Sequence, residues 1–389
     1  MPTLDTDRII AAIRSATAQT GYLALHEPEF RGNEKAYLAD CVDSTFVSSV
    51  GEFVTRFESM LSAATGAKHA IACVNGTAAL QVCLRIVGVE HDQEVIMPSL
   101  TFVATANSVS YLGAVPHFVD CDARTLGLSP GCLAERLNAI GKRSADGVTN
   151  METGRRIAAV VPMHTFGHPA DMTGIQSVCR EWGLPVVEDA TEALGSSSGN
   201  AAAGTLGEVA ALSFNGNKIV TTGGGGAILT RDSELARRAK HLTTTAKVPH
   251  RWAFDHDEIG YNYRLPNLNA ALGCAQMERL DDFVARKRRL AGQYQRAFAD
   301  VPGVSLFVEP TGTKSNYWLN ALLIDRATAD QRDVLLAALN DAGVMARPVW
   351  NLLHRLEIYV HCPRGPLDVS EDLEARIINI PSSAALAHD

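Results

Sequence analysis

The sequence predicts an α/β fold in which a large, mostly parallel sheet is covered by helices on both faces. Short apolar segments alternate with helical segments between residues 70 and 240, and this rhythm is typical of βαβ units. From about residue 267 the pattern changes to a long helical stretch followed by spaced strand-like segments. A chain of 389 residues is long enough for two domains. We therefore expect a large domain over residues 1–265 and a smaller α+β domain, with its connecting helix, over 266–389.

The first elements lead into the sheet. Ile9, Ile10 and Ile13 repeat with helical spacing, and Asp5 or Thr6 can cap the helix that contains them. Helices are expected here at 4–18, 33–43 and 52–65, with a turn at 47–51.

The alternating region supplies the sheet, because each of its strands is a short apolar run bounded by turn residues. Strands are expected at 70–74, 94–97, 115–119, 157–162, 185–187, 209–214 and 227–230, and helices at 77–87, 104–112, 130–140, 173–182 and 232–240. The polar segment 141–155 and the small-residue segment 196–204 are expected to be loops. In the C-terminal region, helices are expected at 267–298, 328–341 and 369–377, and strands near 304–308 and 317–324.

Composition excludes several classes of function. The chain is 46% hydrophobic and 20% charged, with a net charge of -8, which argues against bulk disorder, nucleic acid and anionic membranes as partners. No apolar run reaches the ~18 residues of a membrane-spanning helix, and the polar first residues lack a signal core. Eight cysteines are present, none in a Cys-x-x-Cys pair, and there is no His-Glu-x-x-His. We expect a cytoplasmic protein with reduced thiols and no metal centre.

Two polar side chains follow apolar strands of the predicted sheet. Asp189 ends Val186-Val-Glu-Asp189, and Lys218 ends Ser213-Phe-Asn-Gly-Asn-Lys218, shortly before four glycines at 223–226. Ligands bind at the carboxyl ends of such strands. A lysine that forms a Schiff base and an acid that pairs with a pyridinium nitrogen are what pyridoxal phosphate (PLP) requires. The alternatives are a surface lysine and an aspartate that caps a turn.

A second constellation fits the phosphate of such a cofactor. Asn75-Gly76-Thr77-Ala78 joins a strand to a helix, where free N–H groups and the helix dipole attract an anion, and the Ser213 hydroxyl can contribute. Plain capping of the helix is the alternative. Phe102 follows another strand and is either an aromatic core residue or a ring that stacks on a flat cofactor. A Gly-x-Gly-x-x-Gly motif and a Walker loop are both missing.

These motifs resemble those of the DegT/DnrJ/StrS aminotransferases, which use PLP to aminate keto sugars on nucleotides. The matching segments are 47–51, 75–77, 98–102, 118–120, 188–190, 213–218, 260–266 and 347–350. The resemblance implies the type I PLP-dependent aminotransferase fold. It also implies a homodimer with two shared active sites at its interface.

The resemblance also implies roles for individual residues. Lys218 corresponds to the catalytic Schiff-base lysine and Asp189 to the catalytic pyridinium partner. The remaining cofactor-binding residues implied are Gly76, Thr77, Ala78 and Ser213 at the phosphate, Phe102 on the ring, Glu192 three residues after the aspartate, and Asn262 donated by the other subunit.

Within the family, the chain is similar to the legionaminic-acid-type subgroup. Its marks are His26-Glu-Pro28, Phe30-x-Gly-Asn-Glu34, His164-Thr-Phe-Gly-His168 and Cys362-Pro-Arg-Gly-Pro366. Two residues depart from those that are commoner in the wider family. Glu192 stands where Gln or His is commoner, and Phe46 stands where Trp is commoner. Substrate contacts are expected in loops near 26–50, 164–170, 191–194 and 347–354. The candidate substrate-binding residues are Ser48, Ser49, His164, Arg264, Arg347 and His354, with structural ion pairs as the alternative for the two arginines.

The subgroup implies transfer of the amino group of glutamate to carbon 4 of a nucleotide-linked 4-keto-6-deoxy sugar, UDP-2-acetamido-2,6-dideoxy-hexos-4-ulose, for surface or secondary-metabolite glycans. A dTDP- or GDP-linked sugar is the first alternative. A PLP-dependent sugar dehydratase is a second, although that branch replaces the lysine by histidine and Lys218 is present. A non-enzymatic regulator on the same fold is the third.

Overall fold

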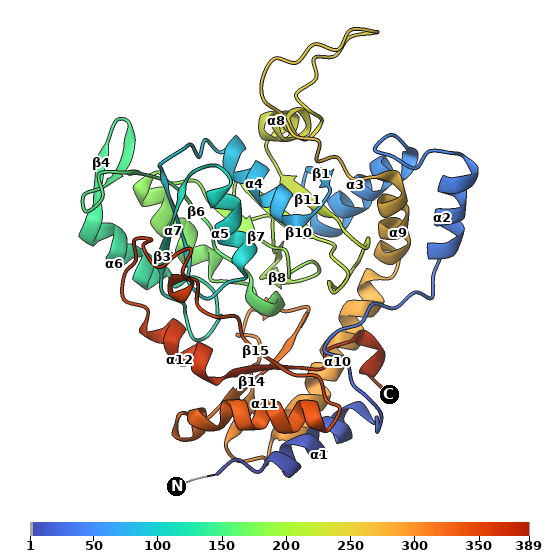
Figure 1. Cartoon of the computed structure of the whole chain (residues 1–389), viewed down its shortest axis with the longest axis vertical. Coiled ribbons are helices and arrows are strands. Elements are labelled where there is room, and N and C mark those ends of the chain that lie inside the picture. Colours follow the sequence, from blue (N-terminus) through green and yellow to red (C-terminus); the bar gives the residue numbers. More distant parts are fainter. Residues whose placement is uncertain (1–2, 389) are drawn as a thin grey trace.

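The computed structural model describes residues 3–388, and its centre is one twisted sheet (Figure 1). Two sets of hydrogen-bonded strands, β3-β2-β6 and β7-β10-β11-β1, are joined by parallel bridges from Val160 to Val186 and from Met163 to Asp189. The strands are β1 (His69–Cys73), β2 (Glu94–Pro98), β3 (Val115–Val119), β6 (Arg156–Val160), β7 (Val187–Asp189), β10 (Val209–Ser213) and β11 (Gly226–Thr230). The sheet is mostly parallel, as predicted, but β11 runs antiparallel to both of its neighbours.

Helices bury both faces of this sheet. In β10, Val209 and Ala211 belong to one apolar cluster, whereas Ala210 and Leu212 belong to another. Alternate side chains of a strand point to opposite faces, so two helical layers cover the sheet (Figure 1). The helices are α2 (Glu34–Asp43), α3 (Glu52–Thr65), α4 (Gly76–Ile86), α5 (Val103–Ser110), α6 (Pro130–Ile140), α7 (Met172–Trp182), α8 (Ser233–Thr243), α9 (Asn267–Met277) and α10 (Leu280–Phe298).

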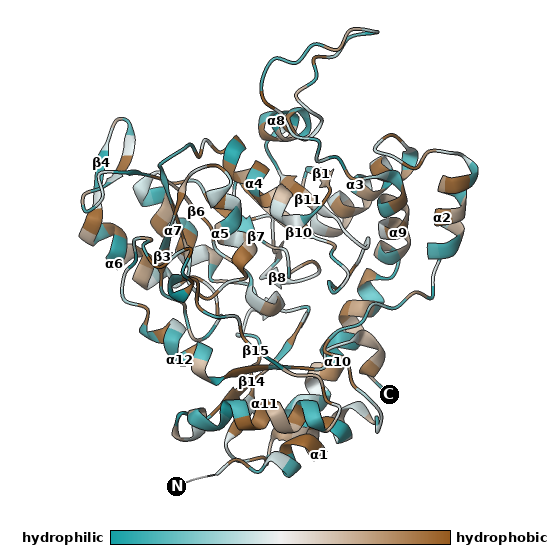
Figure 2. Ribbon diagram, in the orientation of Figure 1, coloured by the Kyte–Doolittle hydropathy of each residue, from teal (hydrophilic) through white to brown (hydrophobic). Residues whose placement is uncertain are grey.

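A second, antiparallel sheet lies below the first, with strand order β12-β14-β16-β15. Its elements are β12 (Val304–Leu306), β14 (Asn320–Ile324), β15 (Arg347–Pro348), β16 (Ile377–Ile380), α11 (Arg332–Asp341) and α12 (Asp368–Arg376). Helix α1 (Thr6–Thr17) packs here, because Ile9 and Ile13 share a core with Leu290 and Leu322. Figure 2 shows β14 in brown, the colour of hydrophobic residues. The domain boundary between residues 265 and 266 stays a prediction. Helix α1 was expected in the first domain, but it packs against α10 and β14, which come after that boundary.

Three local predictions were wrong. The segment 141–155 contains a hairpin, β4 (Gly141–Ser144) and β5 (Gly147–Asn150), because Val148 and Asn150 alternate into the interior. The segment 196–204 contains β8 (Ser197–Ser198) and β9 (Ala201–Ala202), which pair with each other, and β8 also pairs with β13 (Thr313–Lys314). The helix expected over 267–298 is broken between α9 and α10, where Arg279 leaves helical geometry.

An arm, residues 244–262, projects beyond the end of α8 (Figure 1). Bridges from Thr244 to Asn262 and from Lys247 to His256 hold its two sides together. Trp252, at 71% exposure, and Ile259, at 89%, face away from the rest of the chain. Within residues 3–388, no helix combines the length and apolarity needed to cross a membrane.

Candidate active site

A cavity of about 270 Å³ lies at the carboxyl ends of β7 and β10 and at the amino end of α4. Strand ends and helix starts meet there because β7 and β10 are parallel neighbours. Most of the predicted cofactor residues line this cavity, namely Gly76, Thr77, Phe102, Asp189, Glu192, Ser213 and Lys218. The structure therefore brings together side chains that are up to 142 positions apart in the sequence.

Lys218 reaches the cavity from the turn that follows β10. The Lys218 N–H donates to the Asn215 carbonyl over 2.9 Å, which closes this turn. The Lys218 Nζ lies 3.2 Å from Glu192 Oε1 and 3.7 Å from the centre of the Trp318 ring. Carboxylate and indole face both favour a cation. Trp318 was not predicted as a site residue.

Asp189 is held rigidly at the end of β7. Its side chain is buried, and Oδ2 accepts the Thr105 hydroxyl over 2.7 Å. Oδ1 accepts the Thr191 hydroxyl, also over 2.7 Å. Oδ1 also accepts the Thr191 N–H over 3.2 Å, which uses its second lone pair. Oδ2 keeps a further lone pair, so Asp189 can still accept a hydrogen bond from a group in the cavity. The two threonines were also not predicted.

Glu192 is the second acid of the cavity. Burial raises the pKa of Glu192 to about 7, against the opposing charge of Lys218. Its Oε2 accepts the Phe166 N–H over 2.9 Å, and Phe166 has a left-handed backbone with φ +57°. The proton on Glu192 is therefore exchangeable near neutral pH, in direct contact with the Lys218 amine.

The start of α4 forms a cradle beside Ser213. Asn75 Oδ1 accepts the Ala78 N–H over 2.7 Å, so the predicted cap is present and Ala78 is engaged by it. The N–H groups of Gly76 and Thr77 belong to the first turn, which has no partners inside the helix. A Cβ on Gly76 would lie 2.8 Å from the Ser213 Cβ, so only glycine lets the helix start approach this serine. The cradle offers an anion backbone donors, a dipole and hydroxyl groups.

Phe102 is not a core residue, because 48% of it is exposed and it lines the cavity. Its ring centre lies 6.0 Å from that of Trp350, and Trp350 lies 5.1 Å from Phe166. These rings form one apolar wall. Trp350 lies in a matched sequence segment but was not assigned a role.

Predicted substrate residues in the main sheet region lie outside this cavity. Ser48 and Ser49 belong to the 45–51 loop, where the Ser48 carbonyl accepts the Asn267 N–H. His164 is fully buried: Nε2 contacts Glu188 Oε2 at 2.9 Å and Nδ1 accepts the Ala170 N–H. With both ring nitrogens bonded inside the protein, His164 is placed as a structural residue.

Other predicted contacts also point elsewhere. Arg264 pairs with Glu58, which is the structural alternative for this arginine. Arg347 is exposed and donates to the carbonyl of Ala346 over 3.1 Å. His354 Nδ1 contacts Ser99 Oγ at 2.8 Å, and burial lowers the pKa of His354. Asn262 is exposed at the base of the arm. Within one copy of residues 3–388, these four side chains do not line the cavity.

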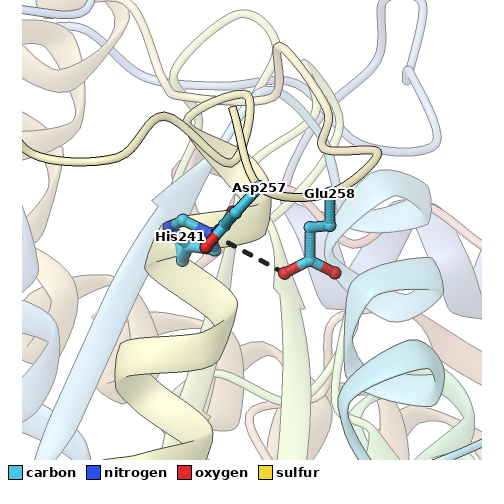
Figure 3. A group of neighbouring side chains, drawn as sticks. All are labelled: His241, Asp257 and Glu258. Atoms are coloured by element: carbon cyan, nitrogen blue, oxygen red, sulfur yellow. Dashed lines mark hydrogen bonds and ion pairs between the residues drawn. The ribbon is translucent and has the colours of Figure 1, made fainter. Parts of the chain in front are cut away.

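A group of His241, Asp257 and Glu258 at the base of the arm has ligand atoms within 4.8 Å of one another (Figure 3). His241 Nε2 lies 2.7 Å from Asp257 Oδ1. Arg238 donates to both carboxylate oxygens of Glu258. This ion pair neutralises the negative charge of Glu258 that a metal ion would need. We assign this group to ion pairing that fastens the arm to α8.

Comparison with known proteins agrees with this geometry. Residues 28–389 match the DegT/DnrJ/EryC1/StrS aminotransferase family. The chain is 37% identical over 370 residues to GDP-perosamine synthase of Caulobacter vibrioides, covering 94% of each chain. It is 30% identical to dTDP-4-dehydro-2,3,6-trideoxy-D-glucose 4-aminotransferase of Saccharopolyspora spinosa, covering 93% of this chain and 92% of the relative.

The fold is that of solved aminotransferases. The aminotransferase TlmJ from Streptoalloteichus hindustanus superposes with a TM-score of 0.84 at 30% identity, covering 93% of this chain and 94% of that one. The predicted type I aminotransferase fold is therefore confirmed. The chain belongs to the DegT/DnrJ/EryC1/StrS aminotransferase family.

Proposed function

We propose that this protein is a PLP-dependent aminotransferase that places an amino group on the keto carbon of a nucleotide-linked sugar. The observation that carries the proposal is the convergence of Lys218 Nζ, the Asp189 carboxylate and the amino end of α4 on one cavity. An amine, a fixed acid and an anion cradle are the three protein groups that PLP requires.

The residues of the cavity fit the parts of this cofactor. The Gly76 and Thr77 N–H groups, with the Ser213 hydroxyl, would hold its phosphate. Asp189 would pair with the pyridine nitrogen and keep it protonated, because a buried carboxylate favours a neighbouring cation. Phe102 would lie against the ring. When bound, PLP supplies an electron sink that lets one site serve both a donor and an acceptor half-reaction.

The chain itself supplies the proton transfers. In each half-reaction Lys218 Nζ would move a proton between the reacting carbon of the substrate and the bound cofactor, taking it from the donor's carbon in the first and delivering one to the sugar's carbon in the second. Glu192, 3.2 Å away, would hold Lys218 in place and exchange protons with it, since the pKa of Glu192 is about 7. The rings of Phe102, Trp318 and Trp350 line the cavity and would limit water at the amine.

For the substrate, we propose a 4-keto-6-deoxy sugar with amination at carbon 4 and glutamate as the donor. The legionaminic-acid-type marks in the sequence favour a UDP-linked N-acetyl sugar. The 37% identical relative is a GDP-perosamine synthase, which favours a GDP-linked sugar as the second candidate. A dTDP-linked sugar is the third, on the name of the Saccharopolyspora spinosa relative.

We further propose that the working unit is a homodimer. The arm carries large apolar side chains that are mostly exposed, among them Trp252 and Phe254, at 71% and 76% exposure. Trp252 contacts the His250 ring and Phe254 the Lys247 amine, both within the arm. Asn262 lies at the base of this arm and outside its own cavity. Docking of the arm on a second copy would bury the apolar side chains and carry Asn262 to the other cavity.

The test is an absorbance spectrum of purified protein with PLP, before and after glutamate, for the wild type and Lys218→Ala. We expect the visible band of a lysine-bound cofactor in the wild type, lost on adding glutamate, and no such band in the variant. Incubation with UDP-, GDP- and dTDP-linked 4-keto sugars, followed by mass spectrometry, then identifies the substrate by its amine product. Wild-type protein that takes up no PLP would overturn the proposal.

A further inference from the structure

Lys287 lies in α10, away from the cavity, and is fully buried. Its Nζ donates to the Trp318 carbonyl over 3.1 Å and to the Ser382 carbonyl. Among the described residues no carboxylate forms an ion pair with it. Burial lowers the pKa of Lys287 to about 7. Burying a lysine amine without a paired carboxylate costs free energy, which indicates a role for Lys287 other than packing.

The carbonyl that Lys287 holds belongs to the residue that covers Lys218. The Trp318 ring lies under the Lys218 Nζ at 3.7 Å, and its Nε1 donates to the Asn217 carbonyl over 2.7 Å. Trp318 therefore touches the Lys218 turn at two points. The backbone carbonyl of Trp318 is in turn bound by Lys287.

The surrounding chain fixes this residue on both sides. Tyr317, just before Trp318, has a left-handed backbone with φ +47°, and Asn316 is tied by its amide to the carbonyls of Glu192 and Leu194. On the side that leads into β14, the Leu319 N–H donates to the Phe166 carbonyl over 3.4 Å, and the Lys287 amine binds the carbonyl of Trp318 itself. Burial, with the charges of Lys287 and Lys218, holds the pKa of His26 well below its usual value, so both amines act on one imidazole.

We propose that Lys287 is a positioning residue for the reaction, which sets the Trp318 indole against the Lys218 amine by binding the Trp318 carbonyl. The inference rests on the proposed function only in taking Lys218 as the reacting amine. Loss of the Lys287 donors lets the 316–319 segment relax, withdraws the indole and exposes the Lys218 amine to water.

The experiment measures the reactivity of the Lys218 amine in cofactor-free protein. Wild type and Lys287→Met are treated with a trace of acetic anhydride, and the labelling rate of Lys218 is read by peptide mass spectrometry. The exposed Lys142 serves as the internal standard. We expect Lys218 to be labelled about threefold to tenfold faster in Lys287→Met, because the cation–π contact and its cover are lost.

Tyr294→Phe is the matched control. Tyr294 is also a fully buried residue of α10, and its hydroxyl donates to the Pro381 carbonyl over 2.8 Å, next to Ser382. The control removes a buried hydrogen bond from the same helix to the same C-terminal segment without touching Trp318. Its Lys218 labelling rate should equal that of the wild type.

A Trp318→Leu background separates positioning from general loosening. If Lys287 acts through the indole, Lys287→Met should change the Lys218 labelling rate by less than about twofold once the indole is removed. Equal Lys218 rates in Lys287→Met and wild type would overturn the proposal, and so would an undiminished effect in the Trp318→Leu background. Should Lys287→Met not fold, Lys287→Gln, whose shorter amide reaches one carbonyl at most, should give an intermediate rate.

The two proposals can fail separately. Labelling is measured without cofactor, so it remains readable if the protein takes up no PLP. In the loaded enzyme we expect Lys287→Met to lower kcat by a similar factor with little change in the KM of the nucleotide sugar, because the substrate surface is untouched.

Discussion

At the scale of single residues, the acids of the cavity differ in their surroundings and therefore in their expected roles. Asp189 receives hydrogen bonds from Thr105 and Thr191, which fix the position of its carboxylate. Glu192 is buried beside Phe166 and Lys218, and its pKa rises to about 7. One acid is arranged to hold a fixed position in the cavity, and the other to exchange a proton near neutral pH.

Asp189→Asn tests the first role. The amide keeps the shape of the side chain but cannot neutralise a protonated pyridine, so we expect kcat to fall by about a hundredfold or more while the fold is retained. Steady-state kinetics and circular dichroism measure the two quantities. Thr191→Val, which removes one hydroxyl donor to Asp189, should give a smaller loss, and a loss as large as that of Asp189→Asn would contradict the assignment.

Glu192→Gln tests the second role through stability. The folded pKa of Glu192, about 7, lies above its ordinary value of 4.5. Between these pH values the native state binds more protons than the unfolded state, so this residue lowers the free energy of unfolding as pH rises from about 4.5 to 7.

Urea unfolding of the cofactor-free protein at pH 5 and pH 8 measures this dependence. The loss of stability between the two pH values should be smaller in Glu192→Gln than in the wild type, whereas Glu357→Gln, at an exposed surface position, should keep the wild-type difference. An unchanged difference in Glu192→Gln would show that this carboxyl is not the buried acid described above.

At the scale of elements, helix α4 depends on close contact with β10. A Cβ on Gly76 would approach the Ser213 Cβ to 2.8 Å, whereas a Cβ on Gly216 would meet nothing within 4 Å. Gly76→Ala should cost about 1–3 kcal/mol, the usual range for overpacking, and weaken PLP uptake. Gly216→Ala serves as the control. Thermal unfolding and PLP titration measure both effects, and equal Tm values for the two variants would contradict a tight cradle.

The sequence predicted those cavity residues that lie at or just after the ends of strands. Asp189 ends β7 and Lys218 lies in the turn after β10, and parallel strands bring their ends to one edge. Trp318 and Trp350 escaped prediction because they reach the cavity from the second sheet region, through contacts far apart in the sequence. A backbone with positive φ at Tyr317 helps to direct that approach, and nothing in the residue type signals it.

Substrate contacts were the least predictable part of the site. Histidine and arginine in matched loops were taken as candidate contacts, yet His164 is bonded to Glu188 and Arg264 to Glu58. Glu188 also accepts the N–H groups of Gly204, Leu206 and Gly207, and Glu58 also accepts the Ala72 N–H. The histidine and the arginine therefore belong to internal hydrogen-bond networks. A sequence shows the charge of a residue but not which partner lies beside it. The same limit applies to element boundaries, since the break between α9 and α10 falls among good helix formers.

At the scale of the whole molecule, the arm exposes large apolar side chains to solvent in the single chain. Its apolar side chains at Trp252, Phe254 and Ile259 are each more than two-thirds exposed, at 71%, 76% and 89%. Exposed apolar groups gathered on one projecting segment indicate a binding surface. Figure 3 shows His241, Asp257 and Glu258 close together at the base of that segment. The ion pairs of His241 with Asp257 and of Arg238 with Glu258 hold this base in place.

Replacing Trp252 and Phe254 by glutamate tests the dimer. Two buried negative charges oppose association strongly, so we expect the double variant to sediment as a monomer of about the 41.7 kDa chain mass, with the wild type at twice that mass. Because Asn262 lies outside its own cavity, dissociation should also weaken PLP binding and lower activity by about tenfold or more. Tyr22→Glu places a charge at a site of similar exposure, 70%, outside the arm, next to Leu23, which bridges to Val344, and should leave mass and activity unchanged. A double variant that keeps the wild-type mass and PLP affinity would show that the arm serves neither assembly nor the second cavity.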